Sequence, residues 1–153
     1  MQLHFLYGTE TGTAEFLCED LQAAIGEEHT SAISSLDTVK PSDLNAETFY
    51  ILVSSTYGSG DVPTTAIDFH EALINDRPNL ENISFAMFGL GDETFGETYN
   101  QGSERLMAEM LACKAQMVGE RGMFNAASSE MPEEVAIPWL EGVLALQAEK
   151  QAA

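Results

Sequence analysis

The sequence predicts a doubly wound α/β fold, in which a parallel sheet carries helices on both faces. Short, nearly continuous apolar runs alternate along the chain with segments whose apolar residues recur at helical spacing. Glycine-rich loops follow three of the apolar runs. In sheets of this kind the crossovers are right-handed and ligands bind outside the carboxyl ends of the strands. We therefore expect a ligand site along that edge.

Five segments are predicted to be strands. Residues 3–7, 49–53 and 83–88 are apolar runs typical of strands buried on both faces of a parallel sheet. Residues 31–35 form a weaker candidate. Apolar residues between 117 and 124 predict one last strand, carried by Met117, Val118, Met123 and Phe124.

Four helices are expected between and after these strands. The first begins at Ala14 and ends at Gly26, a residue typical of helix C-termini. Pro63 opens the second, since proline is well suited to the first turn. The third carries Leu106 and Met110 on its apolar side, and the fourth spans 133–149. Repeats and linkers are absent from the sequence, so 1–153 is expected to be a single domain.

The charge balance restricts the partners. Six Lys and Arg residues stand against 25 Asp and Glu residues, giving a net charge of −19. A field of this sign disfavours nucleic acid and anionic membranes and speeds encounters with basic proteins. The alternative is that acidity only keeps a small protein soluble.

The cysteine count and the hydropathy pattern favour a cytoplasmic protein, and a monomer is expected. Cys18 and Cys113 are the only cysteines, and no CxxC pair or Cys/His metal-ligand set occurs. No basic segment leads into a long apolar run at the N-terminus. No apolar stretch reaches the roughly 18 residues that span a bilayer.

The loop after the first strand is suited to holding one phosphate. The first amides of a helix have no internal partner, and the helix dipole adds positive charge there. Threonine hydroxyls can donate further hydrogen bonds, and glycine lets the backbone approach closely. No GxxxxGK[ST] motif or nearby lysine is present, which excludes a P-loop. The alternative is a threonine-rich cap that only starts the helix. The residues concerned are Thr9, Glu10, Thr11, Gly12, Thr13 and Ala14.

Two further loops carry aromatic residues among glycines. An aromatic side chain on a loop at a ligand-binding edge is suited to stacking on a planar ring system. Together with the phosphate loop, these loops predict a slot for a flat molecule with one phosphate, such as flavin mononucleotide (FMN). The second loop contains Ser54, Ser55, Thr56, Tyr57, Gly58, Ser59, Gly60 and Asp61, and the third contains Gly89, Leu90, Gly91, Asp92, Phe95 and Tyr99.

The segments TETGT, SSTYGSGD and FGLGD, in this order and spacing, resemble the FMN-binding motifs of flavodoxins. The residues of these motifs are most similar to those of small MioC-like flavodoxins and of the flavodoxin domains of diflavin reductases. The resemblance, and not the spacing, implies strand order 2-1-3-4-5 with FMN at the switch point, an arrangement for which flavodoxin is itself the standard example. It implies that 9–14 hold the phosphate, that 54–56 approach the ribityl chain, and that backbone groups of 58–61 and 89–92 meet the polar edge of the ring. Tyr57 and Phe95 would cover its two faces.

The chain departs from the family pattern at three places. Phe95 stands where tyrosine is common, Thr64 and Thr65 stand where acidic and amide residues are frequent, and Asp92 replaces the asparagine of many diflavin domains. None of these changes removes a feature on which the predicted FMN binding depends. No long insertion occurs between 115 and 124, as in short-chain members.

The resemblance implies a one-electron carrier between a reductase, such as a flavodoxin/ferredoxin-NADP reductase, and an acceptor enzyme. A low potential is expected because carboxylates near the flavin oppose the addition of an electron, with Asp61, Asp92 and Glu93 as the local candidates. The flavin carries the chemistry, so no catalytic side chain is expected. An FMN-dependent NAD(P)H quinone reductase is the alternative. A flavin-free signalling domain of the response-regulator kind would need an acidic cluster after the first strand, where this chain has threonines.

Overall fold

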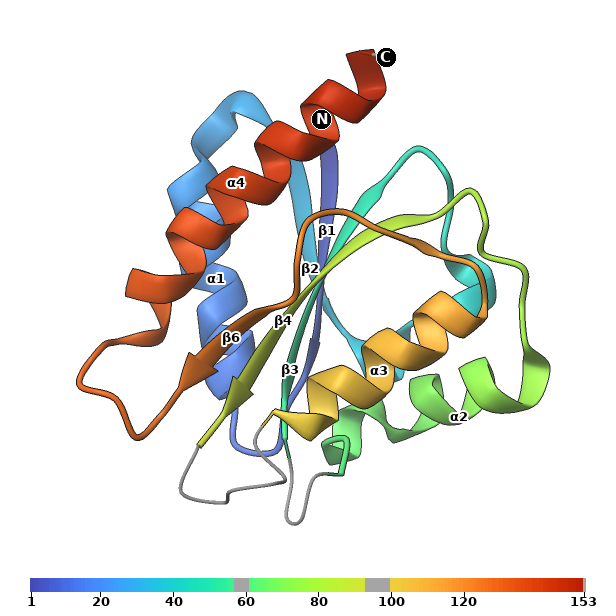
Figure 1. Ribbon diagram of the computed structural model, residues 1–153, viewed down its shortest axis with the longest axis horizontal. Coiled ribbons are helices and arrows are strands. Elements are labelled where there is room, and N and C mark those ends of the chain that lie inside the picture. The colour runs from blue at the N-terminus through green and yellow to red at the C-terminus, as the bar shows by residue number, and fades with distance from the viewer. Residues whose placement is uncertain (57–60, 93–99, 153) are drawn as a thin grey trace.

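The computed structural model describes residues 1–56, 61–92 and 100–152 (Figure 1). Within them the strands are β1 (Gln2–Gly8), β2 (Thr30–Ser35), β3 (Phe49–Ser55), β4 (Ser84–Gly91), β5 (Gln116–Met117) and β6 (Gly122–Asn125). The α-helices are α1 (Thr13–Ile25), α2 (Ile67–Asp76), α3 (Gln101–Ala112) and α4 (Pro132–Ala152). Their alternation along the chain confirms the α/β class.

The strands form one parallel sheet in the order β2-β1-β3-β4-β5, and β6 also pairs with β4. This confirms the order 2-1-3-4-5, with a sixth short strand added. The carboxyl ends of β1, β3 and β4 all point to the same edge of the sheet, the lower edge in Figure 1. The winding reverses between β1 and β3, so a switch point lies at that edge.

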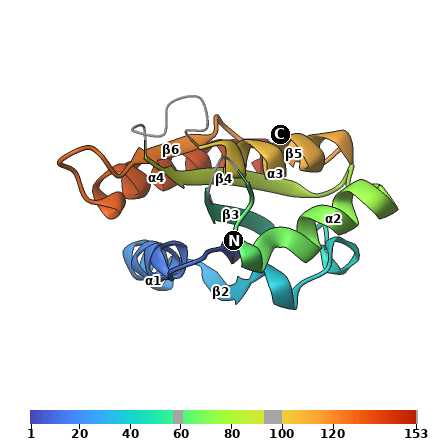
Figure 2. The ribbon, with the colours of Figure 1, turned by 90° about the horizontal axis from the view of Figure 1, so that it is seen from below.

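Two hydrophobic cores lie on opposite faces of the sheet. One is formed with α1 and α4, and the other with α2 and α3 (Figure 2). In β3, Phe49, Ile51 and Val53 face the first core, and Tyr50 and Leu52 face the second. Because both faces are covered, every residue from Phe49 to Ser54 is buried, which explains the unbroken apolar run.

The sequence predicted one continuous last strand, and this prediction was wrong. The segment is divided into β5 and β6. Between the two pairings β4 advances three residues, from Phe85 to Phe88, while its neighbour advances five, from Met117 to Gly122. The chain bulges outward over this interval. Gly119 within it has φ 74°, a conformation that side chains other than glycine rarely adopt.

The helix boundaries differ from the expected ones where short turns intervene. Gly26 ends α1 with φ 64°, as expected for a glycine stop. Pro63 precedes a 3₁₀ turn at Thr64–Ala66, and α2 starts only at Ile67. In the described part of the chain, no helix is both long and apolar enough to cross a membrane.

Candidate functional site

The three strand-to-loop junctions lie in one row at the carboxyl edge of the sheet. Gly8 of β1 pairs with Ser54 of β3, and Ser54 pairs with Gly89 of β4. Beyond this row, the amide of Thr56 donates to the carbonyl oxygen of Leu90 at 3.1 Å. The predicted phosphate loop and the starts of the other two loops are therefore neighbours.

The phosphate loop turns into α1 at Gly12. Gly12 is the N-cap, with φ 95° and no side-chain cap bond to the helix, so no threonine hydroxyl caps α1. The amide of Gly12 donates to Thr9 Oγ1 at 2.8 Å, and the first intrahelical bond is from Phe16 N to Gly12 O. The amides of Thr13, Ala14 and Glu15 precede that bond and have no acceptor within the helix.

The side chains around those amides divide into anchors and exposed donors. Thr9 is buried, and Ala14 lies fully buried in the core beneath α1. Thr11 and Thr13 are exposed, with their hydroxyl oxygens 3.5 Å apart. The loop thus exposes two hydroxyls and the start of α1, while the buried residues Thr9 and Ala14 anchor it on both sides. Residues 9–15 include no Lys or Arg, so the loop's own donors are neutral.

Thr64 and Thr65 fasten the phosphate loop from the segment that precedes α2. Thr65 Oγ1 accepts from the Thr9 amide at 2.8 Å and donates to the Thr9 carbonyl at 3.2 Å. The amide and hydroxyl of Thr64 both donate to Glu10 Oε1. These bonds lower the pKa of the Glu10 carboxyl, because they stabilise its charged form. The departure from the family pattern at 64 and 65 therefore provides the loop's anchor.

The second loop starts from buried backbone. The Ser54 hydroxyl is fully buried and donates to the Ser55 carbonyl at 3.0 Å, while Ser55 and Thr56 are half-buried. Asp61, at the other end of this loop, is exposed and lies 3.6 Å from Arg105 Nη1. Ser54 is thus an internal support, and the accessible polar groups at this strand end belong to the residues that follow it.

The third loop begins at β4 and reaches α3 at Asn100. A Cβ on Gly89 would lie 2.2 Å from Ser103 Oγ, and one on Gly91 would lie 2.9 Å from the Asn100 nitrogen. These glycines let the start of α3 pack directly on the strand. Asn100 is fully buried and takes a left-handed conformation, with φ 56°. The Gly102 amide then donates to Thr56 Oγ1 at 3.0 Å, joining α3 to the second loop.

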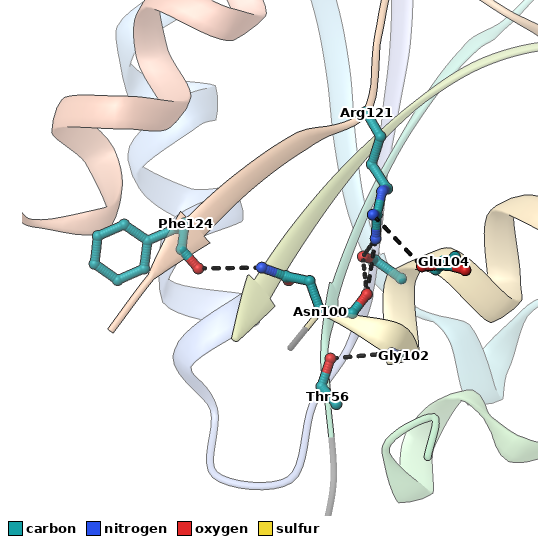
Figure 3. Close-up of polar contacts among 7 residues, drawn as sticks. Thr56, Asn100, Gly102, Glu104, Arg121 and Phe124 are labelled. Carbon is teal, nitrogen blue, oxygen red and sulfur yellow. Dashed lines mark hydrogen bonds and ion pairs between the residues drawn. The ribbon is translucent and has the colours of Figure 1, made fainter. Parts of the chain in front are cut away.

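Arg121, in the bulge between β5 and β6, completes this junction (Figure 3). Its Nη1 donates to the Asn100 carbonyl at 2.7 Å and to Ser103 Oγ at 2.8 Å. Its Nη2 lies 3.8 Å from a Glu104 carboxylate oxygen. From the other side, Asn100 Nδ2 is 3.5 Å from the Phe124 carbonyl oxygen. The outer part of the sheet therefore holds the end of the third loop in place.

The described residues include only part of the predicted site. Thr9 to Ala14, Ser54 to Thr56, Asp61 and Gly89 to Asp92 lie together at the carboxyl edge. The other predicted site residues lie outside the described ranges: Tyr57, Gly58, Ser59, Gly60, Phe95 and Tyr99.

Sequence reasoning missed the residues that support the loops from behind. Asn100 carries a weak signal, since asparagine before a helical pattern is a common N-cap type. Gly102 inside a helical pattern also hints at a close approach. For Arg121 and Thr65 the sequence holds no such signal, because their partners are 18 to 56 residues away.

The arrangement fits FMN. A helix start with unpaired amides, a left-handed glycine and two exposed hydroxyls suits a dianionic phosphate. The two other strand ends lie alongside, at the switch point where such folds bind mononucleotides. Bound FMN supplies the redox chemistry, and the protein supplies binding and electrostatics. In 1–56, 61–92 and 100–152, no three His, Cys, Asp or Glu side chains are grouped to hold a metal ion.

Comparison with known proteins places these motifs in a family. The family model for flavodoxin matches residues 5–139. Protein MioC of Escherichia coli K12 is 31% identical over 87% of this chain and 89% of its own length. The NADPH-dependent diflavin oxidoreductase 1 of Emericella nidulans is 33% identical over 90% of this chain, which spans only 21% of that protein.

Solved structures show the same fold. A flavodoxin from Pseudomonas aeruginosa, solved as a cysteine-to-serine mutant, superposes with a TM-score of 0.81 at 24% identity and covers 96% of this chain and 99% of its own. Oxidised flavodoxin 1 from Bacillus cereus gives a TM-score of 0.80 at 20% identity, covering 95% of this chain and 98% of its own. Because the family model matches most of its length and MioC is 31% identical over 87% of it, the chain belongs to the flavodoxin family of FMN-binding electron-transfer domains.

Proposed function

We propose that residues 1–153 act as one FMN-binding domain, a low-potential one-electron carrier between a flavodoxin/ferredoxin-NADP reductase and an acceptor enzyme. The observation that carries the proposal is the charge at the site's edge. The first turns of α1, α2, α3 and α4 carry Glu15, Asp68, Glu104, Glu133 and Glu134. In this fold helices start at the carboxyl edge of the sheet, so these carboxylates lie toward the same edge as the proposed cofactor site.

The acidic edge suits a basic partner surface. Arg105 and Arg121 are near the site, but they lie beside Asp61 and Glu104, which offset their charge. Complementary charges accelerate docking and orient two redox proteins before electron transfer.

The same carboxylates support a low potential. A negative charge about 8 Å from the flavin, at an effective dielectric of about 20, opposes addition of an electron by roughly 2 kcal/mol. For a one-electron step this is on the order of 90 mV. Exposure and salt reduce the effect of each carboxylate.

In this proposal the phosphate is held by Thr9 to Ala14, and the ribityl chain passes Ser55 and Thr56, while the buried Ser54 supports this strand end from inside. The backbone of Gly58 to Asp61 and of Gly89 to Asp92 meets the polar edge of the ring. Tyr57 and Phe95 stack on its faces, with Tyr99 beside them. The row formed by Gly8, Ser54 and Gly89 supports this assignment, because it aligns the three loop origins.

We further propose a monomer in the cytoplasm. Cys18 and Cys113 are both buried and unpaired. Free thiols are common in proteins of reducing compartments, which supports this location.

The decisive experiment is a reduction assay on the purified protein. We expect a yellow protein with flavin absorbance that is reduced rapidly by NADPH only when a flavodoxin reductase is present. Rapid oxidation of NADPH without the reductase, coupled to quinone reduction, would instead favour the quinone reductase. A protein that neither carries nor takes up FMN would rule out both.

Salt dependence tests the partner's charge. We expect the second-order rate of reduction by the reductase to fall steeply as ionic strength rises, since screening weakens steering. A rate that is independent of salt would contradict docking on the acidic edge.

A further inference from the structure

Glu15 occupies a position from which it can block the phosphate loop. With Gly12 as N-cap and Thr13 as the first helical residue, Glu15 is the third residue of α1. A glutamate at this position commonly folds back to accept a hydrogen bond from the N-cap amide. Such a carboxylate would lie over the amides that the phosphate needs, and would also repel a phosphate dianion.

The Glu15 carboxylate takes another partner in this structure. Glu15 Oε2 accepts a hydrogen bond of 2.6 Å from the hydroxyl of Tyr7. Tyr7 is the next-to-last residue of β1, directly below the phosphate loop, and its half-buried ring packs against the core under α1. The N-cap amide, left without Glu15, donates to Thr9 Oγ1.

The pair is set up to persist in neutral solution. The hydrogen bond to Glu15, with burial second, raises the pKa of Tyr7 to about 12. The phenol therefore remains a donor at physiological pH. Because the Tyr7 ring is packed, its hydroxyl can point in few directions. The Glu15 carboxylate that accepts from this hydroxyl is therefore held in place as well.

We propose that Tyr7 is a positioning residue that holds the Glu15 carboxylate away from the helix-start amides and so keeps the loop open to the phosphate of FMN. The inference rests on the proposed function and deepens it, because it assigns selectivity for the phosphorylated flavin to a residue that does not touch the phosphate. Riboflavin, which lacks the phosphate, does not depend on the pair.

The test measures binding of FMN and riboflavin to the apoprotein by quenching of flavin fluorescence. The proteins compared are the wild type, Tyr7→Phe, Glu15→Ala and the double variant. Tyr7→Phe is expected to weaken FMN binding roughly two- to fivefold, the typical range of anion effects at a helix N-terminus. Riboflavin binding should stay unchanged, because Glu15 competes only with the phosphate. Adding Glu15→Ala to Tyr7→Phe should restore FMN binding, since both the competing charge and the side chain that can accept from the N-cap amide are gone.

Tyr50→Phe is the matched control. Tyr50 also uses its hydroxyl in a hydrogen bond, accepting from the Asn45 amide at 2.8 Å, but it lies near the start of β3, away from the carboxyl edge. Its loss should leave both affinities unchanged. Circular dichroism and urea unfolding of each variant show that the comparison is made on folded protein.

The outcomes are separable. If Tyr7→Phe weakens FMN and riboflavin equally, or if Glu15→Ala fails to rescue it, the inference is overturned while the proposed function stands. If the wild type binds neither flavin, the proposed function fails and the inference falls with it.

Discussion

The guanidinium of Arg121 and the backbone carbonyl of Asn100 join two parts of the chain that lie 21 residues apart. Nη1 of Arg121 is 2.7 Å from the Asn100 oxygen and 2.8 Å from Ser103 Oγ (Figure 3). Only 17% of the Arg121 side chain is exposed, so these bonds are shielded from water. The bulge between β5 and β6 thereby fixes the point where the third loop enters α3.

Replacing Arg121 with methionine should lower the free energy of unfolding by about 2 kcal/mol, because shielded hydrogen bonds from a charged donor are lost. Arg121→Lys keeps the charge but not the forked geometry, so we expect an intermediate loss. Urea unfolding at constant pH measures both. Arg105→Met, which removes an exposed charge pair with Asp61, is the control and should cost under about 0.5 kcal/mol. Equal losses for the two methionine variants would show that Arg121 has no special role.

Gly102→Ala should separate α3 from the second loop. An added Cβ would lie 2.6 Å from the Ser55 carbonyl oxygen and 2.9 Å from Thr56 Cα. Backbone would have to move, at a cost of about 1–3 kcal/mol, and FMN binding should weaken as the loop shifts. Gly142→Ala, in α4 where the added Cβ meets nothing within 4 Å, should instead stabilise by about 0.5–1 kcal/mol. Calorimetric unfolding that gives both variants the same sign would refute this reading of Gly102.

Thr65→Val should loosen the phosphate loop, although valine and threonine side chains have nearly the same shape. Both hydrogen bonds between Thr65 Oγ1 and the Thr9 backbone disappear, at a cost of about 1–2 kcal/mol in unfolding free energy. FMN affinity should fall more than riboflavin affinity, because the loop contacts only the phosphate in the proposed site. Thr30→Val, at the exposed start of β2, is the control. Unchanged FMN affinity in Thr65→Val would argue against the anchor.

The Tyr7–Glu15 pair should appear in the alkaline titration of the folded protein. The pKa of Tyr7 is raised from 10.0 to about 12, mainly by its bond to Glu15. The folded state thus keeps a proton that the unfolded state loses, so the pair's contribution to stability is fully present below about pH 10. It is lost as pH rises from about 10 to about 12.

Ultraviolet difference absorbance of tyrosinate measures this titration. Glu15→Ala should shift one of the four tyrosines to lower pH, because the acceptor of its proton is gone. Glu19→Ala, an exposed acid on the same helix, should leave the curve in place. Matching curves for wild type and Glu15→Ala would disprove the assignment to Tyr7.

The sequence by itself determined the fold class and was sufficient to predict the outline of the site. The run Phe49–Val53 of β3, without a charged or small polar residue, identifies a strand covered on both faces, since such a pattern can be read from neighbouring residues alone. The sequence also indicated Gly12 as part of a tight loop and Gly26 as the end of the first helix. Both residues have a positive φ, which favours glycine. The grouping of the three loops at one edge followed from parallel strands, although the strand order came from family resemblance.

The tertiary structure alone decided how the loops are held. The division of the last strand into β5 and β6 depends on its register against β4, which no residue of that segment encodes locally. The bonds from Thr65 to Thr9, from Gly102 to Thr56 and from Arg121 to Asn100 cross between separate elements. Hydrogen bonding in such contacts depends on where the folded backbone brings two distant groups, whereas helix and strand periodicity depends only on near neighbours. The phosphate loop could therefore be predicted from the sequence, whereas the groups that anchor this loop, and the hydrogen bond from Tyr7 to Glu15, became evident only in the fold.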